Sequence, residues 1–547
     1  MPDDPMTFSS RRSPVYARHG MVASSQPLAT QAGLAILMRG GNAADAAVAT
    51  AAALNVTEPT STGLGGDAFA LYYEARSGAV TALNGSGRAP RALTLERLRF
   101  EGFGVGPGER PLPPFHPHTV TVPGAAAAWC DLIERHGTLP LTEILTPAIV
   151  LAEEGFPVAP LTAHFWARGV DVQLSRAPGG EQLTIDGRAP RHGEIFRNPG
   201  LAATLRALAQ GGKAAFYEGA IAEKIVAVLK SLGGVMAPED LAGHRSTWPE
   251  PISTVYRGVR VHECPPNGQG LAALIALNVL SHLDLPGDPL SAERLHLIIE
   301  ALRTAFADTR WYVADPDRTA VPVEGLLSMD YAAQRARLID PARATLDRQR
   351  GVPVAGSDTV YFCVVDGEGN ACSFINSNFW GFGTGIVPEG CGFSLQNRGH
   401  GFDLDPLHPN VLAPGKRPYH TIIPGLLTRA EDGALIGPFG VMGGDMQPQG
   451  HVQVVIGLAA DGLDPQAALD RPRVCLEDGR ANGRVALEEG IPLAVMARLA
   501  EMGHPVRPVS GYARSLFGRG QIILRDPQTG VLCGGSDPRA DGLAIGF

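Results

Sequence analysis

The sequence predicts a globular protein that mixes helices and strands. Of its 547 residues, 44% are hydrophobic and 18% are charged, a composition that can bury a large core. Helical patterns cover residues 27–54 and a stretch that opens at Ser291, whereas residues 359–366 and 371–379 are rich in β-branched and aromatic side chains. A chain of this length can form three domains or one large α/β fold.

Composition excludes several classes of protein. The 67 glycines and 45 prolines follow no G-X-Y period, so they indicate tight turns and not collagen. The net charge of −9 argues against a nucleic acid or an anionic membrane as the main partner. Seven scattered cysteines without a C-x-x-C pair indicate reduced thiols. Since the first residues also lack the apolar core of a secretory signal, we expect a cytoplasmic protein.

The first elements are two helices and a hairpin. The helical pattern of residues 27–54 is interrupted at Gly40–Gly41, and Asn42 has the side chain of an N-cap for the second helix. Residues 62–90 then carry a Gly-rich turn followed by two short strand patterns, AFALYYEA and AVTALN.

A long and mostly helical region follows, to about residue 340. Its clearest helix opens at Ser291 and presents one apolar stripe, which predicts a buried face. Residues 341–358 are polar and aperiodic, which predicts an exposed loop. The strand TVYFCVVD, residues 359–366, follows this loop directly, and the turn GEGN leads to a second strand, ACSFINSNF.

Common catalytic motifs are missing from the sequence. We find no P-loop, no H-E-x-x-H, no G-x-S-x-G and no dinucleotide-binding glycine pattern. The one tight histidine pair, His116 and His118, lies in a Pro-rich stretch that is more typical of a solvated loop than of a metal site. We therefore predict neither a metal nor a cofactor.

Several long segments resemble one family in the order expected for it. They are HGMVASSQPLATQAGLAILMRGGNAADAAVATAAALNVTEPTSTGLGGDAFALYY (19–73), residues 198–226 and 234–258, GNA (369–371), GFGTGIV (381–387) and GKRP (415–418). Over nearly its whole length the chain resembles the γ-glutamyltransferase family of N-terminal-nucleophile hydrolases. The resemblance implies an α+β fold, a four-layer αββα sandwich.

The resemblance also implies that the chain cuts itself between Asp358 and Thr359. The products would be residues 1–358 and 359–547, which form one intertwined domain. Thr359 would then be the nucleophile, and its new terminal amine would be the base, since a hydroxyl needs an adjacent base to react. The unperturbed pKa of such an amine is about 7.7–8.0, which suits proton transfer near neutral pH.

Two further catalytic features follow from the same resemblance. Gly443–Gly444, in VMGGDMQPQGH, matches the glycine pair whose N–H groups hold the oxyanion. Ser377, 18 residues after Thr359, matches a hydroxyl that supports the nucleophile. Taken without the resemblance, Thr359 could be an ordinary strand residue and the glycines an ordinary turn.

The sequence departs from the family where a glutamyl group would be read. Ser86 replaces an arginine that holds the α-carboxylate, and Gly401 replaces the aspartate that pairs with the ammonium. Phe379 stands at the position of the family's asparagine, and Arg398 stands at the position of its acidic or Gln residue. His420 and Thr421 stand at the positions of its paired serines. Arg88 and Arg417 add further positive charge in the motifs, and structural ion pairs are the alternative role for these arginines.

This contrast predicts a substrate with a carboxylate and without a nearby ammonium. We expect a self-cleaving amidohydrolase for a small, oxamate-like amide, with Arg398, His420, Thr421, Phe379 and Arg88 at the substrate. The alternatives are a γ-glutamyltransferase or glutathione hydrolase with an altered pocket, and a non-catalytic scaffold. The expected partners are the small-molecule amide and the two processed fragments, without nucleic acid or membrane. A homo-oligomer of the processed heterodimer is left open.

Overall fold

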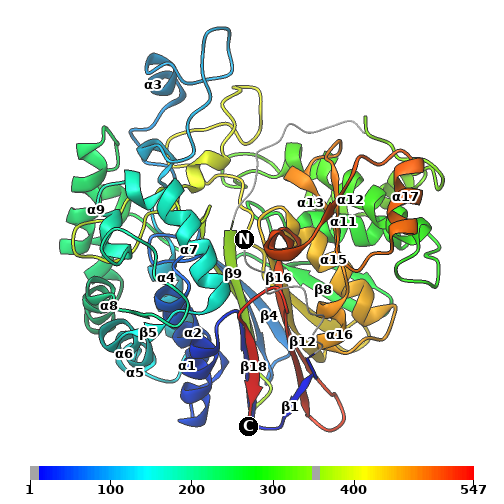
Figure 1. The fold of residues 1–547 in the computed structure, drawn as a ribbon, viewed down its shortest axis with the longest axis horizontal. Coiled ribbons are helices and arrows are strands. Elements are labelled where there is room, and N and C mark those ends of the chain that lie inside the picture. The colour runs from blue at the N-terminus through cyan, green and yellow to red at the C-terminus, as the bar shows by residue number, and fades with distance from the viewer. Residues whose placement is uncertain (1–11, 348–357) are drawn as a thin grey trace.

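The computed structural model describes residues 12–347 and 358–547, and two β-sheets form its centre. The sheets pack face to face, since β12 (Leu435–Met442) and β16 (Arg519–Arg525) of one sheet lie against β9 (Asp358–Asp366) of the other. Helices cover the outer face of each sheet, so the layers run helix, sheet, sheet, helix (Figure 1). This confirms the αββα order that the resemblance implies.

The six-stranded sheet carries the strand predicted to start with the nucleophile. Its strand order is β18 (Leu543–Gly546), β2 (Gly20–Ser24), β9 (Asp358–Asp366), β10 (Ala371–Phe379), β3 (Asp67–Glu74) and β4 (Ala79–Asn84). All its neighbouring strands are antiparallel. The predicted hairpins β3–β4 and β9–β10 are both confirmed.

Strand β9 is buried on both faces. Every residue from Val360 to Val365 is fully buried, because α2 (Ala43–Thr57) covers one face of the strand and β12 and β16 cover the other. A strand in this position needs apolar side chains throughout, which explains the unbroken run VYFCVV. The turn after β9 contains Gly369 at φ +88°, a value that favours glycine.

The seven-stranded sheet lies behind β9. Its order is β1 (Val15–Ala17), β17 (Leu532–Ser536), β16 (Arg519–Arg525), β12 (Leu435–Met442), β11 (Gly425–Arg429), β8 (Val259–Glu263) and β7 (Ile252–Tyr256). Two small sheets are formed by β13 (Val474–Leu476), β14 (Val485–Glu488) and β15 (Val506–Val509), and by β5 (Phe156–Pro157) and β6 (Ile195–Phe196).

The helical layer on the six-stranded sheet begins with α1 (Pro27–Met38) and α2 (Ala43–Thr57). Asn42 caps α2 as predicted, since its side-chain oxygen accepts from the N–H of Ala44 at 2.9 Å. The same half of the molecule holds α4 (Ala125–His136), α5 (Leu141–Ile144), α6 (Thr146–Glu154), α7 (Pro160–Val172), α8 (Pro199–Tyr217), α9 (Ala220–Ser231) and α10 (Pro238–Ala242). The short α3 (Leu95–Phe100) carries Phe100, the most exposed phenylalanine among the described residues.

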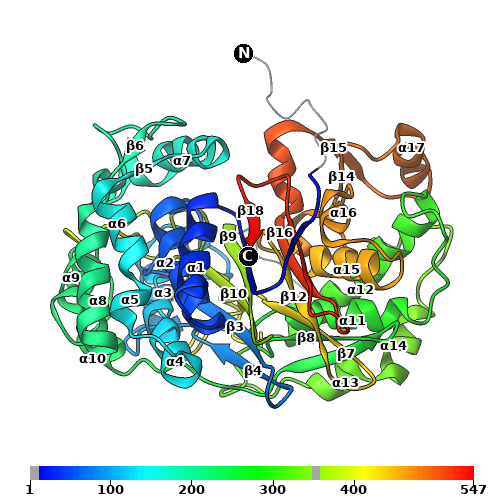
Figure 2. The ribbon, with the colours of Figure 1, turned by 90° about the horizontal axis from the view of Figure 1, so that it is seen from below.

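The other helical layer packs on the seven-stranded sheet (Figure 2). It contains α11 (Gly270–Leu280), α12 (Ala292–Tyr312), α13 (Val323–Leu327), α14 (Met329–Ala336), α15 (Met446–Ala459), α16 (Pro465–Asp470) and α17 (Leu493–Glu501). Ser291 caps α12, and the predicted apolar stripe of this helix lies in the core between α11, α12 and the sheet. Within the described residues, no helix is long and apolar enough to cross a membrane.

Residues on both sides of the predicted cleavage bond contribute to both sheets. The first fragment would supply β1, β7 and β8 to one sheet and β2, β3 and β4 to the other, and the second fragment the remaining strands of each. The cleavage itself stays a prediction. Most of the expected loop at 341–358 lies outside the described residues, which resume at β9.

Candidate active site

The predicted nucleophile lies at the beginning of β9, where the strand enters the sheet. Asp358 pairs with Phe379 of β10, and the register shifts between Asn376 and Phe379. Only the backbone of Asp358 and Thr359 is described, and it runs through the predicted cleavage bond within one strand. Phe379 has φ +81°, a value that is rare for a residue with a large side chain and that costs about 1–3 kcal/mol. Backbone strain therefore lies directly opposite the predicted bond.

The start of β9 lies beside the end of β12. The N–H of Tyr361 donates to the Met442 sulfur at 3.2 Å. Thr359 is two residues before Tyr361, about 7 Å along a strand, and Gly443 follows Met442 directly. The fold thus brings the predicted nucleophile and the predicted oxyanion glycines to the same end of the two sheets.

Gly443 and Gly444 form a sharp connection between β12 and α15. Their φ angles are +128° and +58°, which favour glycine. Their carbonyl oxygens accept from the N–H groups of Met446 and Gln447 at 2.9 and 3.1 Å. Within the described part of the chain, the N–H groups of the two glycines donate to no acceptor. These free donors at a helix N-terminus have the features of an oxyanion site.

Arg398 connects Ser377 and Thr421, two of the residues that the sequence singled out. Its Nη2 donates to Ser377 Oγ at 3.2 Å, and its Nη1 donates to Thr421 Oγ1 at 2.8 Å. The guanidinium lies 4.2 Å from the ring centre of Phe379, a cation–π distance. Ser377 Oγ also accepts from the N–H of Phe379 at 2.9 Å. Four predicted site residues therefore form one connected group.

The charge of Arg398 is fully buried. Among the described residues, no carboxylate lies within ion-pair distance of its guanidinium, and its buried Nε has no hydrogen-bond partner. Burial lowers the pKa of Arg398 to about 9, although the charges of Asp67 and Asp445 act in the opposite direction. The guanidinium thus stays charged at neutral pH. A buried cation without a paired anion is costly, and an anionic ligand would remove that cost.

Gln269 holds the two halves of the site together, and the sequence analysis did not identify it. Its Nε2 donates to the carbonyl oxygens of Thr421 at 2.7 Å and Gly444 at 2.8 Å. Its Oε1 accepts from the Tyr419 hydroxyl at 2.8 Å. The position of Gln269, directly before the apolar helix α11, is the one signal that could have indicated a buried role.

His420 lies in a buried network around Asp67 and not against Arg398. Its Nε2 lies 3.0 Å from Asp67 Oδ2, and its Nδ1 accepts from the N–H of Ile422 at 3.3 Å. Since Nδ1 accepts, the ring proton is on Nε2, and burial lowers the pKa of His420 to about 4. Both ring nitrogens are thus in use. The predicted contact between His420 and a substrate would require one of them to be displaced.

Asp67 is a second residue that the sequence analysis missed. Its Oδ1 accepts from the N–H groups of Gly87 and Gly124 at 3.0 and 3.1 Å and from Gln396 Nε2 at 2.9 Å. An aspartate that opens a buried strand is uncommon, and this was the available signal. The network anchors the loop after β10 to the start of β3.

Arg88 is engaged by two carboxylates. Its Nη1 lies 3.1 Å from Asp315 and its Nη2 lies 2.7 Å from Asp317, and Asp317 also lies 3.7 Å from Arg417. The Arg417 Nε donates to the Ser86 carbonyl at 3.2 Å. These contacts favour the structural ion pairs that were the alternative role for Arg88 and Arg417. A substrate carboxylate would compete there with two aspartates.

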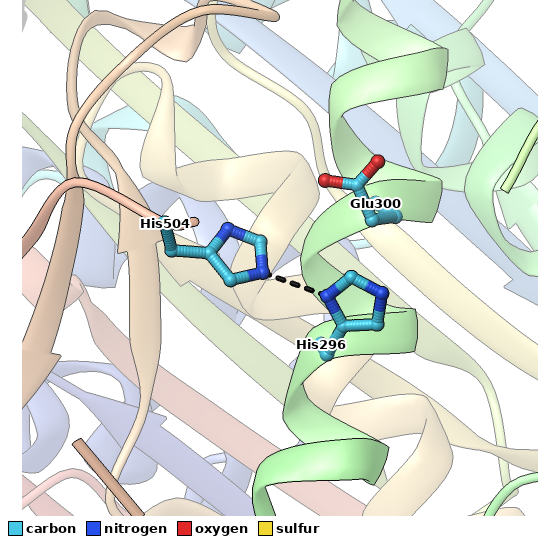
Figure 3. A group of neighbouring side chains, drawn as sticks. All are labelled: His296, Glu300 and His504. Atoms are coloured by element: carbon cyan, nitrogen blue, oxygen red, sulfur yellow. Dashed lines mark hydrogen bonds between the residues drawn. The ribbon is translucent and has the colours of Figure 1, made fainter. Parts of the chain in front are cut away.

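A cluster of possible metal ligands, His296, Glu300 and His504, lies between α12 and the loop that follows α17 (Figure 3). His296 Nδ1 and His504 Nε2 are 2.8 Å apart, and His296 Nε2 lies 2.8 Å from the Asp340 carbonyl oxygen. His296 therefore donates from Nε2 and accepts at Nδ1 from His504. Arg303 lies 3.4 Å from His504 Nδ1 and 3.2 Å from Glu300. A metal cation bound by His296, Glu300 and His504 would be repelled by the Arg303 guanidinium. We therefore interpret this cluster as a hydrogen-bonded network and not as a metal site.

A cavity of about 670 Å³ opens beside the glycine pair. Gly443, Asp445 and Met446 line it on one side, and Phe165 and Trp380 contribute aromatic rings. Asp445 is held by an ion pair with Arg310. Among the described residues, neither Arg398, Ser377 nor Thr421 lines this cavity. Of the glycine pair, Gly443 therefore borders the cavity, whereas the buried Arg398 does not.

Comparisons with known proteins find similarity over nearly the whole chain. A family model described as gamma-glutamyltranspeptidase matches residues 29–547. The chain is 36% identical over 532 residues to the glutathione hydrolase-like YwrD proenzyme of Bacillus subtilis, covering 96% of this chain and 98% of the relative. It is 36% identical over 538 residues to the oxamate amidohydrolase proenzyme of Klebsiella pneumoniae, covering 97% and 98%. The crystal structure of cephalosporin acylase from Bacillus halodurans superposes with a TM-score of 0.92 at 47% identity, covering 100% of this chain and 99% of that one.

Proposed function

The chain belongs to the gamma-glutamyltranspeptidase family, and we propose that it is a self-cleaving amidohydrolase for small amides that carry a carboxylate. As a member of this family it is an enzyme of the hydrolase and acyltransferase type, and its relatives are named proenzymes and acylases. The identities of the nucleophile and of the substrate are our proposals.

The proposed reaction begins with cleavage of the chain. The Thr359 hydroxyl attacks the Asp358 carbonyl, the peptide shifts to an ester, and water opens the ester. This step frees the Thr359 amine. The amine then takes the proton of the hydroxyl as the oxygen attacks the substrate carbonyl.

The oxygen of the substrate carbonyl becomes negative in this step. The N–H groups of Gly443 and Gly444, which donate to no acceptor among the described residues, would bind it, assisted by the N-terminus of α15. The C–N bond then breaks, and the amine leaves with the proton. Water attacks the threonyl ester, which releases the acid and restores Thr359.

The buried charge of Arg398 carries the substrate assignment. It contacts the Ser377 hydroxyl and has no paired carboxylate among the described residues. A carboxylate on the acyl group would supply the missing anion, and arginine can bind it through two parallel hydrogen bonds. An ammonium at the same place would be repelled. Oxamate, a carboxylate joined directly to an amide, has the required groups.

The test compares oxamate with a γ-glutamyl anilide on the purified, self-cleaved protein. We expect ammonia release from oxamate, and for the anilide a kcat/KM below about 10⁴ M⁻¹s⁻¹, the lower end of the ordinary enzyme range. Faster turnover of the anilide with no release from oxamate would establish the alternative, a γ-glutamyltransferase or glutathione hydrolase. A chain that never cleaves itself and acts on neither compound would be a scaffold.

A further inference from the structure

We propose that the cavity beside Gly443 is a subsite for a bulky, aromatic leaving group. The proposal rests on the function proposed above and concerns the amine side of the amide. It predicts that N-aryl derivatives of the small acid are better substrates than its primary amide.

The cavity is much larger than the primary amide needs. Its volume of about 670 Å³ lies within the 300–1,000 Å³ range of sites that bind drug-sized ligands. Oxamate would release only ammonia on its amine side, which would leave this space without a ligand group. A larger substituent on the amide nitrogen would use it.

The walls of the cavity are suited to an aromatic ring. Phe115, Phe165 and Trp380 are only partly buried, and all three line the same space. Phe115 and Trp380 meet edge to face, with ring centres 6.4 Å apart. Aromatic rings add stabilisation to a stacked or edge-on partner beyond the area they bury.

One face of α7 forms a continuous wall. Phe165, Arg168, Gly169 and Val172 have the spacing i, i+3, i+4 and i+7, and all four line the cavity. Val172, an apolar residue, is 45% exposed. Leu516 and Met446 supply apolar surface from other elements.

The position of the cavity assigns it to the amine side. The carbonyl oxygen would lie at the N–H groups of Gly443 and Gly444, and the acyl carboxylate would lie at Arg398. The remaining substituent of the carbonyl carbon is the nitrogen. Among the described residues, Gly443 lines the cavity but Arg398 does not, so the nitrogen and its substituent would point into it.

The test uses two amides of the same acid, oxamate and N-phenyloxamate. Hydrolysis of the second breaks its C–N bond, forms a C–O bond to water and gives oxalate and aniline, the nitrogen taking the proton. We expect kcat/KM to be at least tenfold higher for N-phenyloxamate. Phe165→Ala should lower the ratio of the two values about tenfold, because one aromatic wall is lost. Val172→Trp should lower this ratio further, because the larger side chain would fill the cavity. Since Val172 is exposed, we expect this variant to fold.

Phe100→Ala is the matched control, since Phe100 is 93% exposed on α3 and does not line the cavity. It should change neither rate. The inference is overturned if oxamate is hydrolysed and N-phenyloxamate is not, or if the two cavity variants leave the ratio unchanged.

A second measurement keeps the two proposals separate. Acetanilide has the aromatic amide but no carboxylate, and its binding can be followed by ligand-observed NMR without any turnover. We expect binding to the self-cleaved wild-type protein and loss of binding in Val172→Trp. If neither oxamate is hydrolysed but this difference is found, the proposed acid is wrong and the aromatic subsite stands. Equal binding to both proteins would overturn the subsite.

Discussion

Replacing Arg398 tests the substrate assignment most directly. The guanidinium is fully buried and donates to Ser377 and Thr421, so its loss removes a charge and two donors at once. Arg398→Ala removes the whole group. Arg398→Lys keeps the charge but loses the planar fork, and it should therefore rescue only part of the activity.

The structure indicates the size of the effect. A charge-assisted hydrogen bond to a carboxylate contributes about 1.5–3 kcal/mol, and 1.4 kcal/mol corresponds to a factor of ten. Arg398→Ala should thus lower kcat/KM for oxamate roughly ten- to a hundredfold. Losing the contact with Phe379 would cost about 0.5–2 kcal/mol more, but this loss affects the folded protein whatever the substrate.

A substrate pair separates the two contributions. Oxamide replaces the carboxylate of oxamate with a neutral amide of similar shape. Ammonia release should favour oxamate over oxamide in the wild-type protein, and Arg398→Ala should remove most of that preference. An effect that Arg398 exerts only through Ser377 would lower both rates equally and leave the preference intact.

Self-cleavage should survive in Arg398→Ala, because the chain's own peptide supplies that substrate. A gel and the melting temperature establish that the variant is folded and processed. Arg88→Gln is the control, since Asp315 and Asp317 already bind the Arg88 guanidinium, and it should keep the oxamate preference. A processed Arg398→Ala enzyme that keeps the wild-type rate and preference would refute the argument.

Three further predictions concern the nucleophile, the glycine pair and pH. Thr359→Ala should give one band of full length and no activity, whereas Thr359→Ser should still cleave; a small fragment that begins at any residue other than Thr359 would contradict the assignment. Gly443→Ala should lower kcat by about 10²–10³, because φ is +128° and the new Cβ would lie 3.0 Å from the Gly518 Cα, so the N–H would move. Gly462→Ala is the control: Gly462 has φ +65° and open space around it, so the change should lower the free energy of unfolding and leave kcat unchanged. Burial lowers the pKa of His420 and of His244 to about 4, and it lowers the pKa values of His116, His136 and His262 to about 4 as well, so between pH 6.5 and 4 these histidines bind more protons in the unfolded chain than in the folded one. Glu58, whose pKa burial raises to about 7, acts in the opposite direction but is one group against these five. The free energy of unfolding of uncleaved Thr359→Ala should therefore fall as the pH is lowered through this range, and a flat urea-unfolding profile would contradict the assignment of neutral buried histidines.

Much of the local structure was determined by the sequence alone. Asn42 and Ser291 lie at helix starts, and a capping side chain acts within its own turn, so residue type and spacing suffice. The apolar run of β9 likewise predicted a buried strand, because it is a pattern of neighbouring residues. Ordered motifs also led to the family, and with it to the αββα order of layers. The pair β7–β8 was missed inside a region that the sequence analysis described as mostly helical, because short strands give a weak periodic signal.

Only the tertiary structure decided which side chains meet. Gln269 bonds to Thr421 and Gly444, which are 152 and 175 residues away, and His420 bonds to Asp67, which is 353 residues away. No periodicity spans such distances, because a hydrogen bond between distant segments depends on how the sheets and loops pack. The same holds for charge. Arg88 and Arg398 are both arginines in site motifs. The fold places two aspartates against Arg88, whereas no carboxylate among the described residues lies within ion-pair distance of Arg398. This difference in the surroundings of two like charges is what makes Arg398 the candidate for binding an anion.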